Sequence, residues 1–185
     1  MRKNVLLSIK GTLILIAVFL MMGCVTNQFA DDPLETVEAL NLERYLGEWY
    51  EIARFQSGFE KNIFGATAEY SLREDGRIKV LNSGFKKNLD GPYTSIEAVA
   101  WRPDDNLPGE LKVRFFKLFN ADYFVFGLDH ENYQWALVGN NERKFLWFLS
   151  RTPEISEKTL NMMKEMALEQ GYDLTNLFFV PQKQR

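Results

Sequence analysis

Short runs of alternating apolar and polar residues fill the sequence between residues 49 and 150, and they constrain the fold more than any other feature. The runs are rich in aromatic and β-branched residues, and groups of Gly, Pro, Asn and Asp separate them. The segment "REDGR" has Asp-Gly at its centre, which is typical of a tight hairpin. The runs predict strands at 49–55, 66–73, 77–84, 94–102, 110–117, 122–129, 134–139 and 145–150.

This strand order favours an all-β sandwich or barrel. We predict an eight-stranded antiparallel up-and-down β-barrel, because closure leaves no edge strand and a barrel of this size can hold one small ligand. One C-terminal α-helix should follow, with Ser156 as its N-cap and Gly171 just beyond its end. The apolar run 177–180 predicts a short ninth strand.

The alternation assigns one face of each strand to the barrel interior. On the first strand Trp49, Glu51, Ala53 and Phe55 should point inward and Arg54 outward. Inward alanines on later strands leave room that a solid core would fill. A one-residue slip would invert any of these assignments. The predicted ligand-binding lining is Phe55, Ala68, Tyr70, Val80, Asn82, Ala98, Val113, Phe115, Tyr123, Val125, Trp147 and Leu149. For Glu51 a structural partner is favoured over a ligand contact, because buried carboxylates are usually paired.

The N-terminal residues have the pattern of a secretory signal. Arg2, Lys3 and Lys10 form a positive region before an uncharged apolar run at 12–23, which is too short for a typical membrane-spanning helix. We therefore predict a signal peptide over residues 1–23. An uncleaved anchor is the alternative.

Cys24 follows this segment directly and resembles the cysteine of a bacterial lipobox. Met21 stands where that motif usually has Leu, and Gly23 precedes the cysteine. The resemblance implies that Cys24 is lipidated and becomes the first residue of the mature chain, although an ordinary signal with an incidental cysteine would look similar. Val25, rather than the Asp of inner-membrane lipoproteins, implies the outer membrane. The polar segment 24–40 should be a tether.

Composition excludes several kinds of protein. A net charge of −3 argues against nucleic-acid binding. The chain has one His and one Cys, too few for a Cys/His metal cluster, for Ser-His or Cys-His catalysis or for an internal disulfide. We therefore expect no metal, no cofactor and no nucleic-acid partner.

Three short motifs resemble the lipocalins, in particular the bacterial outer-membrane lipocalins and apolipoprotein D, over a predicted barrel domain at 41–182. "RYLGEWYEIARF" contains the Gly-x-Trp motif at Gly47 and Trp49. "GLDHEN" keeps only Asp129 of the usual Thr-Asp-Tyr, and "FLSRTP" supplies Arg151 after the last barrel strand. The degenerate second motif is the main departure from the family pattern.

The resemblance implies roles for these residues and for the chain. Trp49 should plug the closed end of the barrel, with Arg151 across its indole and hydrogen-bonded to nearby backbone. The protein should be a carrier and not an enzyme, attached to the membrane through lipidated Cys24 in the outer membrane and facing the periplasm. Its ligands should be fatty acids, lysophospholipids or phospholipids.

If Trp49 marks the closed end, the open end has the loops 56–65, 85–93, 117–121 and 139–144. Lys and Arg outnumber acidic residues there, which favours a ligand with an anionic head. These loops also contain aromatic residues that suit a membrane, a lid or a second copy, so a homodimer is one option: Phe59, Phe64, Phe85, Tyr93, Phe116 and Phe119.

Two other functions stay open at this point. A lipoprotein with a filled barrel would act as a scaffold for partners, although the inward alanines argue against it. A lipocalin-fold enzyme would need Glu51 and Tyr70, because the barrel lacks the cysteine nucleophile used by isomerase relatives.

Overall fold

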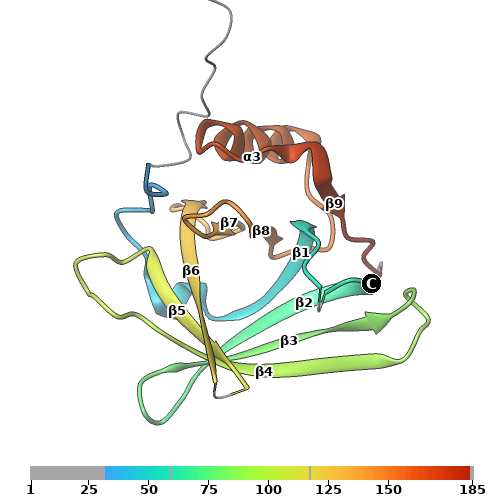
Figure 1. The fold of residues 1–185 in the computed structure, drawn as a ribbon, viewed down its shortest axis with the longest axis horizontal. Helices are drawn as coiled ribbons and strands as arrows, with labels where there is room; N and C mark the ends of the chain where they lie inside the picture. Colours follow the sequence, from blue (N-terminus) through green and yellow to red (C-terminus); the bar gives the residue numbers. More distant parts are fainter. Residues whose placement is uncertain (1–31, 59, 117, 184–185) are drawn as a thin grey trace, which may run out of the picture. The chain divides into compact units, whose positions relative to one another are not determined.

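The strands of this chain form one sheet that curls around a central space (Figure 1). The computed structural model describes residues 32–58, 60–116 and 118–183. The strands are β1 Gly47–Phe55, β2 Ile63–Leu72, β3 Ile78–Lys86, β4 Tyr93–Trp101, β5 Glu110–Phe115, β6 Phe119–Leu128, β7 Trp135–Gly139, β8 Leu146–Ser150 and β9 Leu177–Phe179. Their order in the sheet is β2-β3-β4-β5-β6-β7-β8-β1-β9, and a further β1–β2 pairing closes the barrel. All pairings are antiparallel, so the predicted barrel with a short ninth strand is confirmed.

Two strands start three residues earlier than the sequence pattern predicted. β2 begins at Ile63, which pairs with Lys86, and β6 begins at Phe119, which pairs with Phe115. In both places a partner strand extends the ladder into residues with loop-like composition. Pairing across the sheet therefore sets these strand boundaries, and local strand propensity does not predict them.

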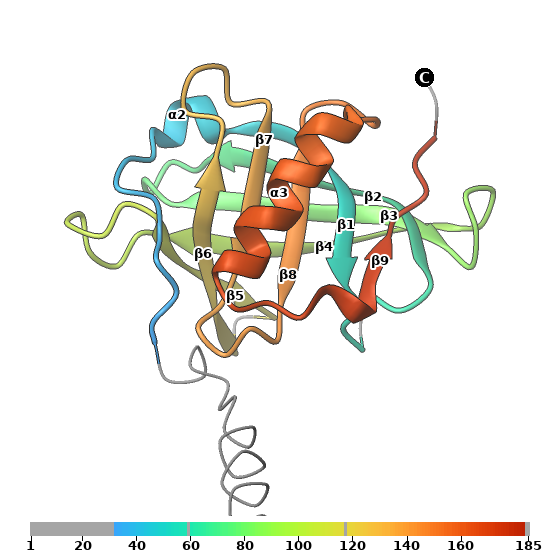
Figure 2. The same ribbon diagram turned by 90° about the horizontal axis from the view of Figure 1, so that it is seen from above.

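The main helix, α3 Glu157–Glu169, lies against the outside of the barrel (Figure 2). The Ser156 side chain accepts the Thr159 backbone N–H, and Gly171 has a φ of 82° beyond the helix end, as predicted. Met163 and Ala167 form the fully buried face of α3. Two short helices complete the fold, α2 Leu42–Tyr45 and η1 Leu174–Asn176.

Two apolar cores hold these layers together. One lies inside the barrel toward its closed end and includes Trp49, Val125 and Leu149. The other lies between the barrel wall and α3 and includes Phe148 and Met163. β-strands with both faces buried explain why β7 and β8 are nearly continuous apolar runs.

Trp49 and Arg151 close one end of the barrel as the family motifs predicted. The Arg151 guanidinium lies 3.8 Å from the Trp49 ring centroid. It also donates to the backbone carbonyls of Glu48 and Arg44, each at 2.8 Å. Gly47 has a φ of 94°, a conformation that favours glycine, and a Cβ there would lie 3.4 Å from the Arg151 side chain. The plug is thus tied to the entry of β1.

Asp129 has a local structural role. Its carboxylate accepts the backbone N–H groups of Asn132 and Gln134, each at 3.2 Å. These bonds hold the turn between β6 and β7.

The segment that precedes the barrel differs from the predicted tether. Leu34 and Leu40 are buried, and the Val37 backbone N–H donates to the Val125 carbonyl at 2.9 Å. Residues 33–40 therefore belong to the folded unit, because Leu34 and Leu40 pack into the two apolar cores although the stretch around them is polar. The predicted signal peptide and Cys24 lie outside the described residues. Within the described part of the chain, no helix has both the length and the apolar character needed to cross a membrane.

The seam between β1 and β2 is closed partly by the C-terminal segment. Direct β1–β2 pairing covers only Gly47 to Tyr50 on β1. Farther along, the Gln182 side-chain amide donates to the Glu51 carbonyl at 2.8 Å and to the Ala66 carbonyl at 3.1 Å. The Val180 backbone N–H donates to the Ile52 carbonyl at 3.0 Å. The residues after β9 thus bond to both strands where they separate.

Candidate binding cavity

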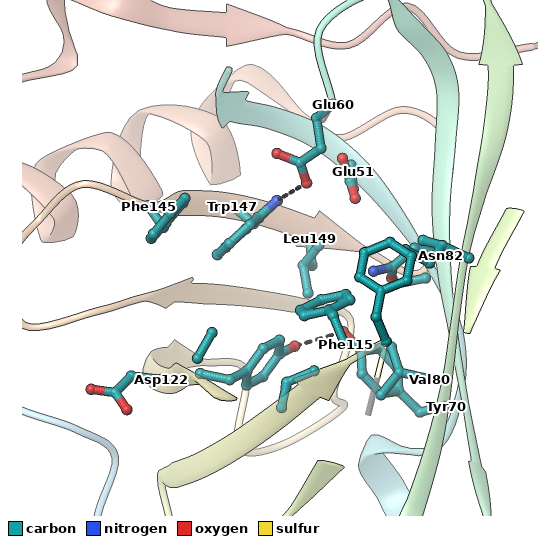
Figure 3. A pocket seen from close by; sticks show the side chains of 16 residues that line it. Glu51, Glu60, Tyr70, Val80, Asn82, Phe115, Asp122, Phe145, Trp147 and Leu149 are labelled. Atoms are coloured by element: carbon teal, nitrogen blue, oxygen red, sulfur yellow. Dashed lines mark hydrogen bonds between the residues drawn. The ribbon is translucent and has the colours of Figure 1, made fainter. Parts of the chain in front are cut away.

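A cavity of about 320 Å³ occupies the barrel interior (Figure 3). Its wall combines residues from most strands with residues of three loops at the end opposite Trp49. Those loop residues are Glu60, Phe116 and Phe145, which places the opening where the sequence predicted it. The full lining is Glu51, Glu60, Ala68, Tyr70, Val80, Asn82, Ile96, Val113, Phe115, Phe116, Ala121, Asp122, Tyr123, Phe145, Trp147 and Leu149.

Most of the predicted lining residues border this cavity. They are Ala68, Tyr70, Val80, Asn82, Val113, Phe115, Tyr123, Trp147 and Leu149. Ala98 and Val125 point inward but lie in the buried core below the cavity. The alternation rule thus found the correct face of β2, β3, β5 and β8.

Phe55 was wrongly predicted to line the cavity, and Arg54 was wrongly predicted to point outward. A register shift between Glu51 and Ala53 interrupts the pairing of β1 with β8. Beyond it the faces are exchanged: Phe55 packs outside the barrel with its ring centroid 6.0 Å from that of Tyr172, and Arg54 is fully buried. A β-bulge adds one residue to a strand and reverses the alternation that follows.

Arg54 organises the wall near the cavity mouth. Its Nη1 donates to Glu51 Oε2 at 2.6 Å. Its Nη2 donates to the backbone carbonyls of Glu60 and Ile63, each at 2.8 Å. The predicted structural partner of Glu51 is therefore Arg54, yet Glu51 also borders the cavity. One buried cation joins a barrel carboxyl to the loop that frames the opening.

Glu60 was not among the predicted lining residues. Its Oε1 accepts the Trp147 indole N–H at 3.0 Å, and its Oε2 accepts the Ser57 hydroxyl at 2.6 Å. Figure 3 shows the carboxyls of Glu51 and Glu60 on the same side of the cavity. Because Glu60 lies in an irregular loop, no periodic pattern could have assigned its direction.

Burial raises the pKa of the Glu51 carboxyl from its ordinary 4.5 to about 7, and the neighbouring Glu60 carboxyl adds to the effect. The positive charge of Arg54 opposes this rise in the pKa. The folded protein therefore binds the Glu51 proton more tightly than the unfolded chain does. The stability gained from this proton is complete below about pH 4.5 and is lost as the pH rises through about 7.

The variant Glu51→Gln should remove this pH dependence. The free energy of unfolding of the wild type minus that of Glu51→Gln is the quantity to compare. We expect this difference to fall by about 2–3 kcal/mol as the pH rises from mildly acidic to mildly alkaline. Urea denaturation of both proteins across that range measures the difference. Parallel pH profiles would contradict the assignment.

A second, more polar recess of about 360 Å³ lies beside the cavity, toward β3 and β4. It shares Glu51, Glu60 and Asn82 with the cavity and adds Arg54 and the exposed Lys86. Both acidic and basic groups therefore surround the opening. The predicted preference for an anionic head stays a prediction.

The open-end loops also contain exposed apolar residues. Tyr93 is 61% exposed, Phe116 67% and Leu118 78%. Phe64 instead packs against Phe178, and Phe85 packs against Tyr93. Phe59 and the side chain of Phe119 lie outside the described residues. Local packing therefore accounts for part of the aromatic loop composition.

The geometry of this barrel, its Trp–Arg plug and its open cavity agree with the comparison to known proteins. The model of the lipocalin-like domain matches residues 40–182. The chain belongs to the lipocalin-like family. This lipocalin is 39% identical over 164 residues to outer membrane lipoprotein Blc of Vibrio cholerae, a match that covers 89% of this chain and 94% of that one.

Two further relatives of this lipocalin have other names. Temperature-induced lipocalin-1 of Arabidopsis thaliana is 40% identical over 158 residues, with 80% of this chain and 83% of that one covered. Apolipoprotein D of Cavia porcellus is 32% identical over 151 residues, with 78% of each covered. Among solved structures, insecticyanin of the tobacco hornworm Manduca sexta has a TM-score of 0.67 at 18% identity, covering 83% of this chain and 86% of that chain. That likeness shows the fold.

Proposed function

We propose that this lipocalin binds fatty acids or lysophospholipids and phospholipids, and that it stores or transports them without chemical change. The observation that carries the proposal is the cavity of about 320 Å³, which is closed at the plug and open between three loops. Its wall is mostly apolar, with Val80, Val113, Phe115 and Leu149 among its residues. An alkyl chain placed there would gain about 25 cal/mol for each Å² removed from water.

The proposed location is the outer membrane, facing the periplasm, where the protein would serve membrane maintenance. A signal peptide at 1–23 and lipidation of Cys24 would provide the anchor, since several acyl chains together give stable attachment. The relatives named outer membrane lipoprotein Blc support this location. Residues 25–32 would link the anchor to the folded unit that starts at Pro33.

The head group of the ligand would lie in the polar recess near the opening. Lys86 could contact a phosphate or carboxylate there, and the carboxyls of Glu51 and Glu60 could contact an ammonium group. A lysophospholipid with a zwitterionic head offers both charges, whereas a fatty acid offers one. Competition between these two ligand classes separates them.

Mass spectrometry of organic extracts from residues 25–185, purified after bacterial expression, tests the proposal. The domain is made without Cys24, so any lipid detected is a bound one. We expect a long-chain lipid to co-purify and to be displaced stoichiometrically by a fatty acid or a lysophospholipid. If nothing co-purifies and neither competitor binds, the proposal is wrong and a scaffold function becomes the leading alternative.

A further inference from the structure

Three tyrosine hydroxyls form a connected group next to the Trp49 plug. The Tyr123 hydroxyl lies 2.8 Å from the Tyr45 hydroxyl and 2.8 Å from the Tyr70 hydroxyl. The Tyr45 ring packs on Trp49, with centroids 5.0 Å apart. Tyr70 and Tyr123 border the cavity, whereas Tyr45 lies behind them. We call these three residues the tyrosine group.

The number of protons in the tyrosine group exceeds the number of its internal hydrogen bonds. Three hydroxyls carry three protons, and the two bonds use two of them, whichever way each bond runs. One O–H therefore remains to be donated, and no hydrogen bond among the described residues takes it up. Rotation of the hydroxyls can place this proton on Tyr70 or on Tyr123 without any movement of the rings.

The hydroxyls stay protonated at neutral pH and thus remain donors. Burial raises the pKa of Tyr45, Tyr70 and Tyr123 above the usual tyrosine value. For Tyr70 the nearby negative charge of Glu51 raises the pKa further.

The apolar surroundings of the tyrosine group make it energetically unfavourable to leave the remaining O–H without an acceptor. Val80, Val113 and Leu149 form the adjacent wall of the cavity and offer no side-chain acceptor. Figure 3 shows the Glu60–Trp147 hydrogen bond on one side of the cavity and the hydrogen bond to Tyr70 on the other, with Leu149 between them. A plain alkyl end at this place would leave the donor without a partner, which is unfavourable in an apolar site.

We propose that the tyrosine group is a binding site for an acceptor oxygen at the buried end of the ligand. The inference rests on the proposed lipid-binding function and refines it. The preferred ligand is an amphiphile whose inner end bears a hydroxyl or carbonyl oxygen, as an ω-hydroxy fatty acid does. Tyr70 or Tyr123 donates to that oxygen, while the polar head stays near Glu51 and Glu60 at the opening.

Competition binding to the mature domain tests the site with matched pairs of ligands. The probes are dodecanoic, tetradecanoic and hexadecanoic acids and their ω-hydroxy counterparts. In the wild type the affinity ratio of the ω-hydroxy acid to the plain acid should peak at the one chain length that reaches the tyrosine group. Plain acids that bind more tightly than their ω-hydroxy counterparts by the same factor at every length would overturn the inference.

The variant Tyr70→Phe/Tyr123→Phe removes both hydroxyls that border the cavity. At the best chain length the ratio should fall about three- to tenfold, the range expected for one neutral hydrogen bond. The control is Tyr133→Phe, which removes a buried hydroxyl that accepts the Asn41 N–H outside the cavity. It should leave the ratio unchanged.

The outcomes separate the two proposals. If the wild type binds neither kind of acid and no lysophospholipid, the lipid-binding function itself is wrong. If it binds plain acids and the double variant keeps the wild-type ratio, the function stands and the acceptor site is wrong, as when a bound water takes the spare proton. If the double variant does not fold, the chain-length series in the wild type still decides.

Discussion

Replacing Arg54 by Met should lower the free energy of unfolding by about 3–5 kcal/mol at alkaline pH, where Glu51 is ionised in the wild type. The methionine keeps the apolar stem but removes the guanidinium that bonds to Glu51 and to the carbonyls of Glu60 and Ile63. A buried carboxylate and two carbonyls then lose their partner, and each such loss is unfavourable. Urea denaturation measures the change.

The same variant should lose less stability at acidic pH. A protonated Glu51 carries no charge and needs no cation beside it. Because Arg54 lowers the pKa of Glu51, its removal should raise that pKa above about 7, so the difference between wild type and Arg54→Met should grow as the pH rises above about 7 and be smallest below it. Arg73→Met is the matched control, because Arg73 pairs with Asp75 on the surface, where ion pairs contribute little. If Arg54→Met unfolds at the same urea concentration as the wild type, the bonds of Arg54 to Glu51 and to the loop that contains Glu60 do not stabilise the fold.

Replacing Ala121 by Trp should weaken lipid binding by about a hundred- to a thousandfold, since the lost burial of an alkyl chain corresponds to about 3–4 kcal/mol. Ala121 borders the cavity and is only half-buried, so an indole can enter the empty space without displacing the packed core. Titration with a fluorescent fatty acid gives the affinity.

The neighbouring residue on β6 supplies the control for this substitution. Asn120 is exposed, does not border the cavity and accepts from the Arg114 guanidinium on the outer face. Asn120→Trp should therefore bind lipid as the wild type does. Unchanged affinity in Ala121→Trp would show that the ligand lies elsewhere, and the scaffold function would then gain support.

The barrel and its plug could be predicted from sequence because their signals are local or belong to a specific motif. Regular strand spacing gave the fold class, and the motif residues Gly47, Trp49 and Arg151 located the closed end. Their placement follows the prediction in detail, with the Arg151 guanidinium 3.8 Å from the Trp49 ring centroid.

The errors arose where one inserted residue or one irregular loop decides the direction of a side chain. The bulge between Glu51 and Ala53 carries no special residue such as glycine, so alternation continued wrongly to Phe55. Glu60 acts through a loop that has no period. The folded segment around Leu34 was overlooked because a few apolar residues in a polar stretch do not reveal a long-range contact.

The tyrosine group could be predicted only in part from the sequence. Alternation correctly placed Tyr70 and Tyr123 in the wall, but the hydroxyl contacts depend on ring positions across the barrel. Tyr45 precedes the first strand and had no predicted role. A hydrogen-bonded group assembled from three separate elements has no signature in any one of them.

The seam between β1 and β2 ties barrel closure to the order in which the chain is made. The carbonyls of Glu51 and Ala66 both accept from the Gln182 side chain, and the Ile52 carbonyl accepts from the Val180 backbone N–H. Chains are synthesised and exported from the N-terminus onward, so the strands that need this seal appear long before it does. We expect a chain that stops short of Val180 to lack these donors where β1 and β2 separate, and to be more sensitive to proteases than the whole fold. Complete closure of the barrel wall between β1 and β2 therefore requires the last residues of the fold.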